Sequence, residues 1–80
     1  MSTLTPVREP LAMSVKVSDS ALHIVVADGR ELSVPLAWFP RLLNATRKER
    51  EDWRLIGGGI GIHWSAVDED ISVDSLLQAH

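Results

Sequence analysis

Residues 21–35 read ALHIVVADGRELSVP, and this stretch decides the fold because apolar and polar residues alternate on both sides of a turn signal. Every second residue from 22 to 26 is a large aliphatic, and residues 31–34 repeat the alternation. Between them lie Asp28 and Gly29, and glycine tolerates the positive φ that a two-residue hairpin requires. The stretch therefore predicts a β-hairpin with one apolar face.

The residues before this hairpin predict one more strand. Val15 and Val17 alternate with polar residues, which is the period of a strand with one buried face. Asp19 and Ser20 then provide a tight turn, so three antiparallel strands should follow one another as a meander. The first dozen residues show no such period and contain two prolines, so we expect a flexible arm over residues 1–12. A single domain over residues 13–80 should follow it.

After Pro35 the apolar spacing changes from two residues to three or four. This spacing is typical of a short helical segment, here interrupted by Pro40, and it is set by Leu36, Trp38, Phe39, Leu42 and Leu43. A second short helix is expected over residues 47–52, because Thr46 and Glu49 match a capping box in which each side chain bonds the other's main-chain amide.

The last third of the chain predicts strands and one more helix. Residues 54–56 and 60–64 indicate a strand pair around the glycine turn at 57–59, and residues 68–70 indicate a polar loop. Ser72 can cap a final helix whose apolar face comprises Val73, Leu76 and Leu77. The whole pattern predicts an α+β fold, a small antiparallel meander sheet with two or three short helices.

Composition narrows the classes of function. The chain has 80 residues, a net charge of −3 and no Cys, which predicts one small domain without disulfides, thiol catalysis or cysteine-bound zinc. No apolar run approaches the roughly 18 residues that span a bilayer, so we expect no membrane partner and a cytoplasmic location. The acidic balance also gives no electrostatic footprint for nucleic acid.

No motif indicates a cofactor or a metal. A strand-like segment rather than a helix follows the glycine cluster, so we interpret it as a hairpin turn in which Gly61 eases a close backbone approach. The alternating acids at 68, 70 and 74 lack the glycine and glutamate that complete a calcium loop. His23, His63 and His80 lack the spacing of metal ligands. We therefore expect no cofactor, no metal ligand and no catalytic residue.

The charged run at residues 47–52 indicates a solvated helix face rather than a basic patch. On a helix Arg47 faces Glu51 and Lys48 faces Asp52, and these pairs neutralise one another. We therefore do not expect the chain alone to bind DNA or RNA through this segment.

The aromatic residues are more informative about binding. Trp53 and Trp64 should lie in the core, with Trp53 anchoring the end of the second helix to the sheet. Trp38 and Phe39 are adjacent at a corner flanked by prolines, where both rings can hardly be buried. We expect this pair, together with Arg41, to bind a partner protein.

The chain also resembles a known family. The segments DGRELSVPL, AWFPRLLNAT, GGGIGIHW and DEDISVDSLL follow in this order, with a capped helix ending in DW between the second and third. Their succession is similar to the bacterial domain of unknown function numbered 2442, and the resemblance runs from Ser14 to Leu77. It implies a compact α+β domain with no established enzymatic activity.

The resemblance further implies a role in a two-gene pair, in which such domains accompany a small neighbouring toxin as its antitoxin. Relatives that bind DNA carry an added helix-turn-helix, for which this chain has no room after Val73. Our leading hypothesis is a non-enzymatic protein-interaction module, an antitoxin-like component whose partner is the small protein of the neighbouring gene. The alternatives are a DNA-binding regulator or co-repressor, and a small enzyme or ligand-binding domain using His63, Trp64 and Asp68. A homodimer through an edge strand is also compatible with the sequence, and Val25 and Ala27 on the less apolar face would suit it.

Overall fold

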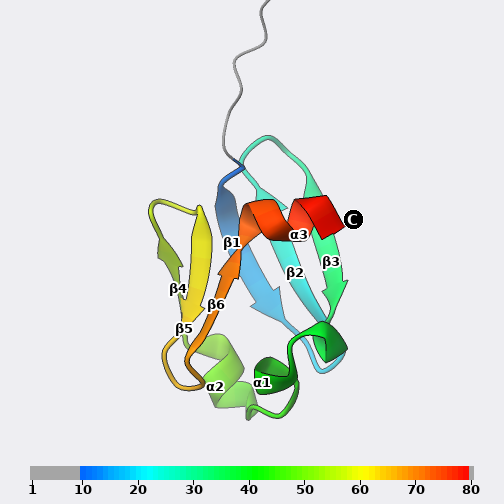
Figure 1. Ribbon diagram of the computed structural model, residues 1–80, viewed down its shortest axis with the longest axis vertical. Helices are drawn as coiled ribbons and strands as arrows, with labels where there is room; N and C mark the ends of the chain where they lie inside the picture. Colours follow the sequence, from blue (N-terminus) through cyan, green and yellow to red (C-terminus); the bar gives the residue numbers. More distant parts are fainter. Residues whose placement is uncertain (1–9, 80) are drawn as a thin grey trace, which may run out of the picture.

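Two three-stranded antiparallel sheets, linked by short helices, make up the part of the chain that the structure describes (Figure 1). This computed structural model describes residues 10–79, so most of the expected arm lies outside the described residues. The first sheet has the order β1-β2-β3 and the second β4-β5-β6. The elements are β1 (Ala12–Val17), β2 (Ala21–Val26), β3 (Glu31–Pro35), the 3₁₀-helix η1 (Leu36–Trp38), α1 (Pro40–Leu43), α2 (Arg47–Glu51), β4 (Trp53–Ile56), β5 (Gly61–Trp64), β6 (Glu69–Ser72) and α3 (Val73–Ala79).

The first sheet forms from the predicted alternation. Leu22, Ile24 and Val26 are all buried on its inner face, and β2 pairs with β1 on one side and with β3 on the other. The turn between β2 and β3 has three residues rather than two, because the Val26 amide donates to the Arg30 carbonyl at 2.8 Å. Gly29 takes the last place in this turn with a φ of 98°, as the longer hairpin requires.

Strand β2 is the central strand of the first sheet, so it cannot supply the edge-strand homodimer that the sequence left open. Val25 is exposed on the outer face of a strand that has a neighbour on each side, and Ala27 lies in the turn. Neither residue therefore lies on an edge strand.

Strand β1 begins at Ala12, one residue before the expected start of the domain. Ala12 is buried, and its amide donates to the Gly59 carbonyl at 2.8 Å. A Cβ added to Gly59 would lie 2.5 Å from the Ala12 carbonyl oxygen, so this glycine permits the close backbone approach. The role assigned to Gly61 was wrong, because a Cβ there would meet nothing nearer than 3.4 Å, an ordinary contact.

Strand β6 replaces the polar loop predicted at residues 68–70. Glu69 and Asp70 are strand residues paired with Trp64 and His63 of β5. Acidic residues disfavour strands in general, but here each lies in register with a β5 residue and Ile71 is buried between the sheets. The turn lies earlier, over residues 65–68.

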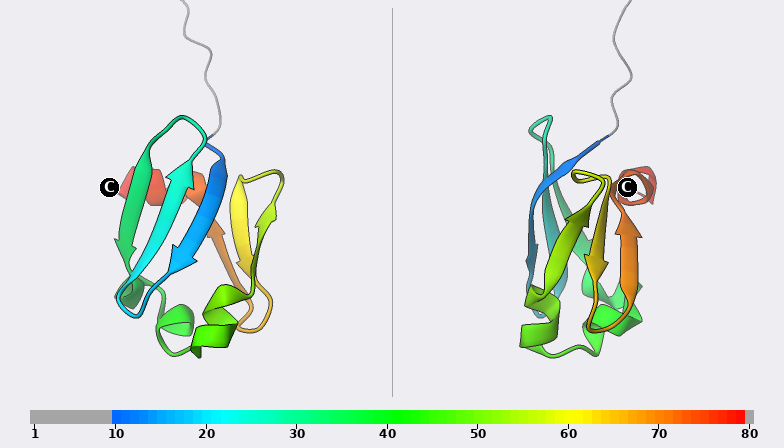
Figure 2. Two further views of the ribbon diagram at one scale, coloured as in Figure 1. Left: turned by 180° about the vertical axis from the view of Figure 1, so that it is seen from behind. Right: turned by 90° about the vertical axis from the view of Figure 1, so that its left-hand side faces the viewer.

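The two sheets face one another across a shared core. Figure 2 shows the first sheet as one layer, with β5, β6 and α3 on the other side of the core. Trp64 is the largest fully buried side chain, which confirms its predicted place. Trp53 is half-buried and contacts the core cluster from β4. The other fully buried large side chains come from both layers and the corner between them: Leu22, Ile24, Val26, Val34, Leu36, Leu42, Ile62 and Val73.

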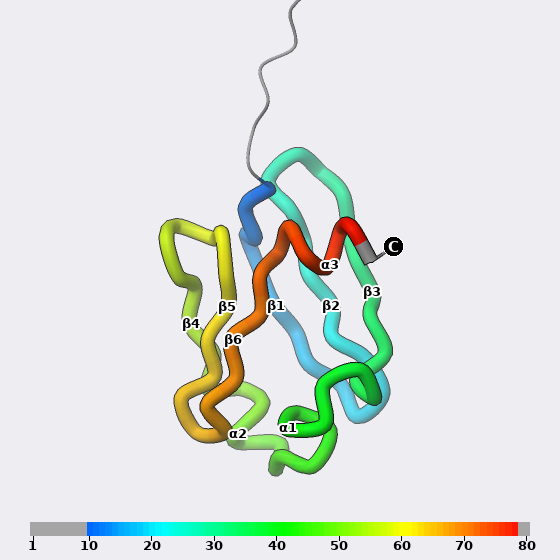
Figure 3. Tube along the Cα trace, in the orientation of Figure 1, coloured from blue at the N-terminus to red at the C-terminus, as the bar shows by residue number. Residues whose placement is uncertain are grey.

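The short helices close one end of the molecule. The chain passes from the first sheet to the second through η1, α1 and α2, and α3 returns across the inner face at the other end (Figure 3). The capping box at α2 forms as predicted, with Thr46 and Glu49 each bonding the other's amide. Ser72 caps α3 through its hydroxyl, which accepts from the Ser75 amide at 3.3 Å. Within residues 10–79, every helix is too short to cross a bilayer.

Candidate functional site

The corner that carries Trp38 and Phe39 is built by two buried leucines. Leu36 and Leu42 are fully buried on either side of the aromatic pair. The Leu36 amide donates to the Ser20 carbonyl at 2.9 Å, which ties η1 to the turn between β1 and β2. Phe39 ends η1 and begins α1, and its carbonyl accepts the amides of Leu42 and Leu43 at 2.9 Å. The backbone that carries the two rings is therefore held rigidly.

The two rings of this corner differ in exposure. Phe39 is half-buried against the core, whereas Trp38 is 50% exposed. Exposure at this level is unusual for a residue with so much apolar area. Trp38 is thus the member of the pair that lies at the surface.

A groove of about 400 Å³ opens beside these rings. One wall consists of Trp38 and Phe39, and the others are formed by β6 and α3. The residues contributed by β6 and α3 are Asp70, Ile71, Ser72, Ser75 and Leu76. We call this the Trp38 groove. It brings an aromatic corner next to an edge strand, since β6 pairs with β5 alone.

Arg41, the third predicted binding residue, does not line the Trp38 groove. Its Nη1 donates to the Asp68 carbonyl oxygen at 2.6 Å. This bond holds α1 to the turn before β6, where Asp68 adopts a positive φ of 51°. The structure therefore places Arg41 as a support for the position of β6, although the side chain is exposed.

The outer face of the second sheet carries a polar row that the sequence analysis missed. Arg54, His63 and Asp70 are in register across β4, β5 and β6. The His63 Nδ1 lies 2.5 Å from the Asp70 Oδ1. His63 was correctly placed on a strand, but the predicted loop at residues 68–70 concealed its partner. The pairing of His63 with Asp70 could be predicted only from the register between β5 and β6, which the sequence does not reveal.

Beside this row lies a hollow over Gly61. Gly61 stands between Ile56 and Ser72 in the next cross-strand row, and its missing side chain leaves space on the outer face. The hollow has a volume of about 340 Å³, and Ile56 and Ile60 are exposed at its edge. Asp70 and Ser72 line both this hollow and the Trp38 groove. The surface is thus hollowed on both sides of β6.

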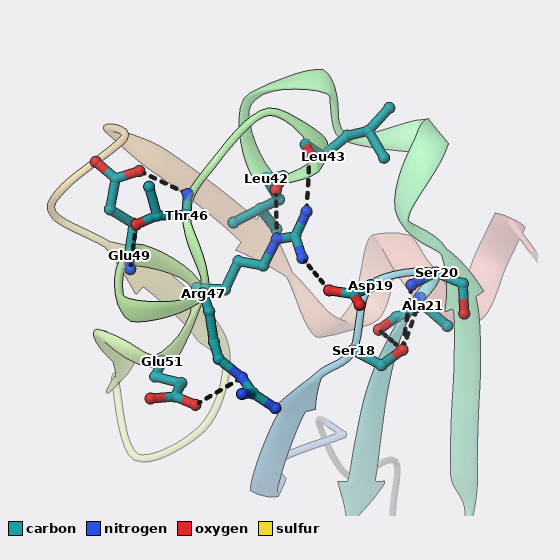
Figure 4. Close-up of polar contacts among 11 residues, drawn as sticks. Ser18, Asp19, Ser20, Ala21, Leu42, Leu43, Thr46, Arg47, Glu49 and Glu51 are labelled. Atoms are coloured by element: carbon teal, nitrogen blue, oxygen red, sulfur yellow. Dashed lines mark hydrogen bonds and ion pairs between the residues drawn. The ribbon is translucent and has the colours of Figure 1, made fainter.

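Arg50 supports the corner from inside. Its Nε donates to the Leu42 carbonyl at 2.9 Å and its Nη2 to the Leu43 carbonyl at 2.8 Å, which satisfies the end of α1. Nη1 bonds Asp19 at 3.0 Å, and Figure 4 shows these acceptors converging on one guanidinium. The Arg50 carbonyl in turn accepts the indole N–H of Trp64.

The prediction of a wholly solvated face for residues 47–52 was therefore wrong at Arg50, which is buried. The last carbonyls of α1 have no hydrogen-bond partner within the helix, and the Arg50 guanidinium supplies the donors for them. Arg47 does pair with Glu51, at 3.9 Å, but no Lys48–Asp52 ion pair occurs in the described part of the chain. The single buried arginine could not be told from its exposed neighbours without the packing of α2.

No group of side chains in residues 10–79 has the arrangement of a metal site. Asp28 and Arg30, which have shifted pKa values, lie in the turn between β2 and β3, and neither lines the Trp38 groove. There the Arg30 guanidinium bonds the Asp28 carboxylate at 2.7 Å and holds the pKa of Asp28 below its ordinary value. The same contact raises the pKa of Arg30.

Comparison with known protein families shows the family to which the chain belongs. Residues 12–79 match the family described as Protein of unknown function (DUF2442). The chain belongs to this family. The match covers every strand and helix described above, so the resemblance seen in the motifs extends through the whole fold.

A solved structure supports the fold independently. The crystal structure of a protein of unknown function from Rhodospirillum rubrum is 23% identical, covers 90% of this chain and 89% of its own, and has a TM-score of 0.75. At this identity the likeness shows the shared fold alone. No curated protein matches the chain.

Proposed function

We propose that this chain is a non-enzymatic protein-interaction module that binds its partner at the Trp38 groove. The observation that carries the proposal is the half-exposed Trp38 ring beside a groove, on a backbone fixed by the fully buried Leu36 and Leu42. Rigid aromatic side chains beside a pocket are the typical anchors of protein interfaces. Such an anchor loses little conformational entropy on binding because its backbone is already ordered.

The charge of the chain indicates the kind of partner. A net charge of −3 and the acids on β6 favour a basic protein, because complementary charge speeds encounter and selects the right partner. The more specific role, an antitoxin that covers the toxin of a neighbouring gene, rests on the family resemblance of the sequence. We propose this antitoxin role and a cytoplasmic location for the chain.

A non-enzymatic role is supported by the setting of the His63–Asp70 pair. The pair lies on the outer face of a sheet, and the Asp70 side chain is 69% exposed. Catalytic pairs are effective where water is excluded, and an open sheet face does not exclude it. The region of His63, Trp64 and Asp68 also does not form a unit, since Trp64 points into the core and is fully buried.

Direct DNA binding is the weaker alternative. Of the three cations in the charged run, Arg50 is buried and Arg47 pairs with Glu51. Phosphate binding requires several exposed cations on one surface, and this helix offers chiefly Lys48. A gel shift on the DNA upstream of the gene at two salt concentrations would detect such binding.

Co-expression with the product of the neighbouring gene tests the proposed function. We expect a complex whose mass by light scattering equals that of both chains, together with recovery of host growth if the neighbour is toxic. Trp38→Ala should abolish the complex, whereas Val25→Ala, which shortens an exposed apolar side chain on the first sheet, should leave it intact. Absence of a complex with the unaltered chain would refute the proposal.

A further inference from the structure

The free edge of β6 presents main-chain groups whose direction follows from the ladder. The Val73 amide donates to the Ile60 carbonyl at 3.0 Å, immediately beyond the paired residues of β5 and β6. In an antiparallel pair the hydrogen-bonded residues alternate, so the next ladder bonds fall at residues 71 and 69 of β6. Asp70 and Ser72 therefore direct their main-chain amides away from β5, toward the edge.

This edge opens into the Trp38 groove. Asp70 and Ser72 line the groove opposite Trp38 and Phe39, so an extended chain placed there would meet both main-chain donors and aromatic rings. Addition of a strand to a free edge is a common mode of peptide recognition, in which main-chain bonds supply affinity and side-chain pockets supply specificity. Among the edge strands of the two described sheets, β6 is the one that lines the Trp38 groove.

The charge of β6 selects the occupant. In a second copy of this chain, two β6 strands side by side would bring acidic residues together, because Glu69 and Asp70 occupy half of the strand. Like charges on adjacent strands are destabilising, whereas opposite charges stabilise. The edge therefore opposes self-pairing and favours a basic segment.

We infer that β6 accepts an extended basic segment of the partner protein as a fourth strand of the second sheet, an inference that rests on the proposed function. The cross-strand rows of the second sheet indicate which side chains this segment should carry. The residue in line with Asp70, His63 and Arg54 is a lysine or arginine that pairs with the Asp70 carboxylate. The residue in line with Ser72 is a large apolar one, directed toward the hollow over Gly61.

These two side chains lie two positions apart on the segment, because residues on one face of a strand alternate. The segment pairs antiparallel with β6, so its apolar residue, opposite Ser72, precedes its basic residue, opposite Asp70. The probe is therefore an acetylated and amidated pentapeptide, Thr-Leu-Val-Lys-Thr, whose Leu and Lys share one face. Two matched peptides serve as controls. One carries N-methyl groups on Lys and Leu, which removes the amides that would donate to β6, and the other has Glu in place of Lys.

The measurement is the change in amide shifts of the ¹⁵N-labelled chain during titration with each peptide to millimolar concentration. We expect the first peptide to shift the amides of Asp70 and Ser72 and the indole signal of Trp38. The N-methylated peptide should lose these shifts, and the Glu peptide should bind more weakly. Asp70→Lys should weaken binding of the first peptide by about fivefold, whereas Glu31→Lys, the same charge change on the edge strand β3, should not.

Two results would overturn strand addition: equal shifts with the N-methylated peptide, or no shift at Asp70 and Ser72 with the unmethylated one. Failure of this inference can be told from failure of the proposed function. A co-expressed complex that Trp38→Ala abolishes, combined with no peptide-induced shift at Asp70 and Ser72, would refute the strand while keeping the protein-binding role. Loss of all binding to the partner by the unaltered chain would remove both.

Discussion

The two sheets of this molecule have the same topology but different outer faces. Both are three-stranded antiparallel meanders, and both contribute fully buried aliphatic residues to one core. The first sheet has strands of 6, 6 and 5 residues, and its central strand has a neighbour on each side. The second has strands of 4 residues each, with a glycine in β5 and two acids in β6.

This difference separates stability from binding. A regular alternation of large aliphatic residues contributes most where both neighbours are present, as in β2. In the second sheet, the glycine in β5 and the two acids in β6 are less favourable strand residues than large aliphatics. These short strands therefore depend more on packing against the rest of the molecule. The second sheet carries the hollow over Gly61, one wall of the Trp38 groove and the free acidic edge. We therefore propose that it takes the binding role and that the first sheet is its scaffold.

The largest effect expected from the loss of a polar contact comes from the arginine that joins the two regions. Arg50→Met should lower the free energy of unfolding by about 3 kcal/mol, because the carbonyls of Leu42 and Leu43 lose charged donors in a buried setting. Arg47→Met on the same helix is the matched control, since the Arg47 side chain is 91% exposed, and it should change stability by less than about 0.5 kcal/mol. Urea unfolding followed by tryptophan fluorescence measures both. Equal losses would show that Arg50 does not hold the corner.

Two glycines of the second hairpin should respond in opposite directions. Gly59→Ala should destabilise the chain by about 2 kcal/mol, because the new Cβ would lie 2.5 Å from the Ala12 carbonyl oxygen at a φ of 118°. Gly61→Ala should instead stabilise it by about 0.5 kcal/mol, since a Cβ fits there and alanine restricts the unfolded chain more than glycine. Thermal unfolding of the two variants compares them directly.

The Gly61 variant also tests the division between the sheets. Its added methyl group fills part of the hollow on the outer face, so it should weaken binding of the partner while it raises the unfolding temperature. A variant that gains stability and keeps full binding would show that the hollow plays no part in recognition.

The sequence predicted the first sheet more completely than the second, for a physical reason. Burial of alternate residues leaves a period that can be read from Leu22, Ile24 and Val26 alone. In β6 the acids at 69 and 70 interrupt any such period, and the strand depends on pairing with β5 and on burial of Ile71. A contact between residues distant in the chain has no local signature.

The candidate site shows the same limit. The unusual pairing of Trp38 and Phe39 between two prolines was visible as a surface corner. The groove beside it was not, because its other walls come from β6 and α3, more than thirty residues later. Arg50 was hidden for the same reason, since its acceptors belong to α1 and to the turn before β2.

A smaller effect on stability is expected at Trp38 itself. Trp38→Ala should lower the free energy of unfolding by only about 1 kcal/mol, because half of the side chain is exposed. Its effect on partner binding should be at least about 2 kcal/mol if the ring is the anchor. Trp64→Ala is the contrasting variant: the ring is fully buried, and the loss of stability should be about 4 kcal/mol. Calorimetric titration of the folded Trp38 variant with its partner separates the two effects.

The smallest effect should appear at the turn of the first sheet and only in acid. The Arg30 guanidinium lowers the pKa of Asp28 in the folded chain, so the folded state holds this carboxylate in its charged form. The contribution is present above the unfolded pKa of about 4 and is lost as the pH falls through the lower folded value. Asp28→Asn should therefore remove a small part of the acid sensitivity of unfolding while leaving the second sheet unchanged. Because both side chains are well exposed, high salt should have the same effect as the substitution. An acid sensitivity that is unchanged in the variant would show that the Asp28–Arg30 pair does not contribute to it.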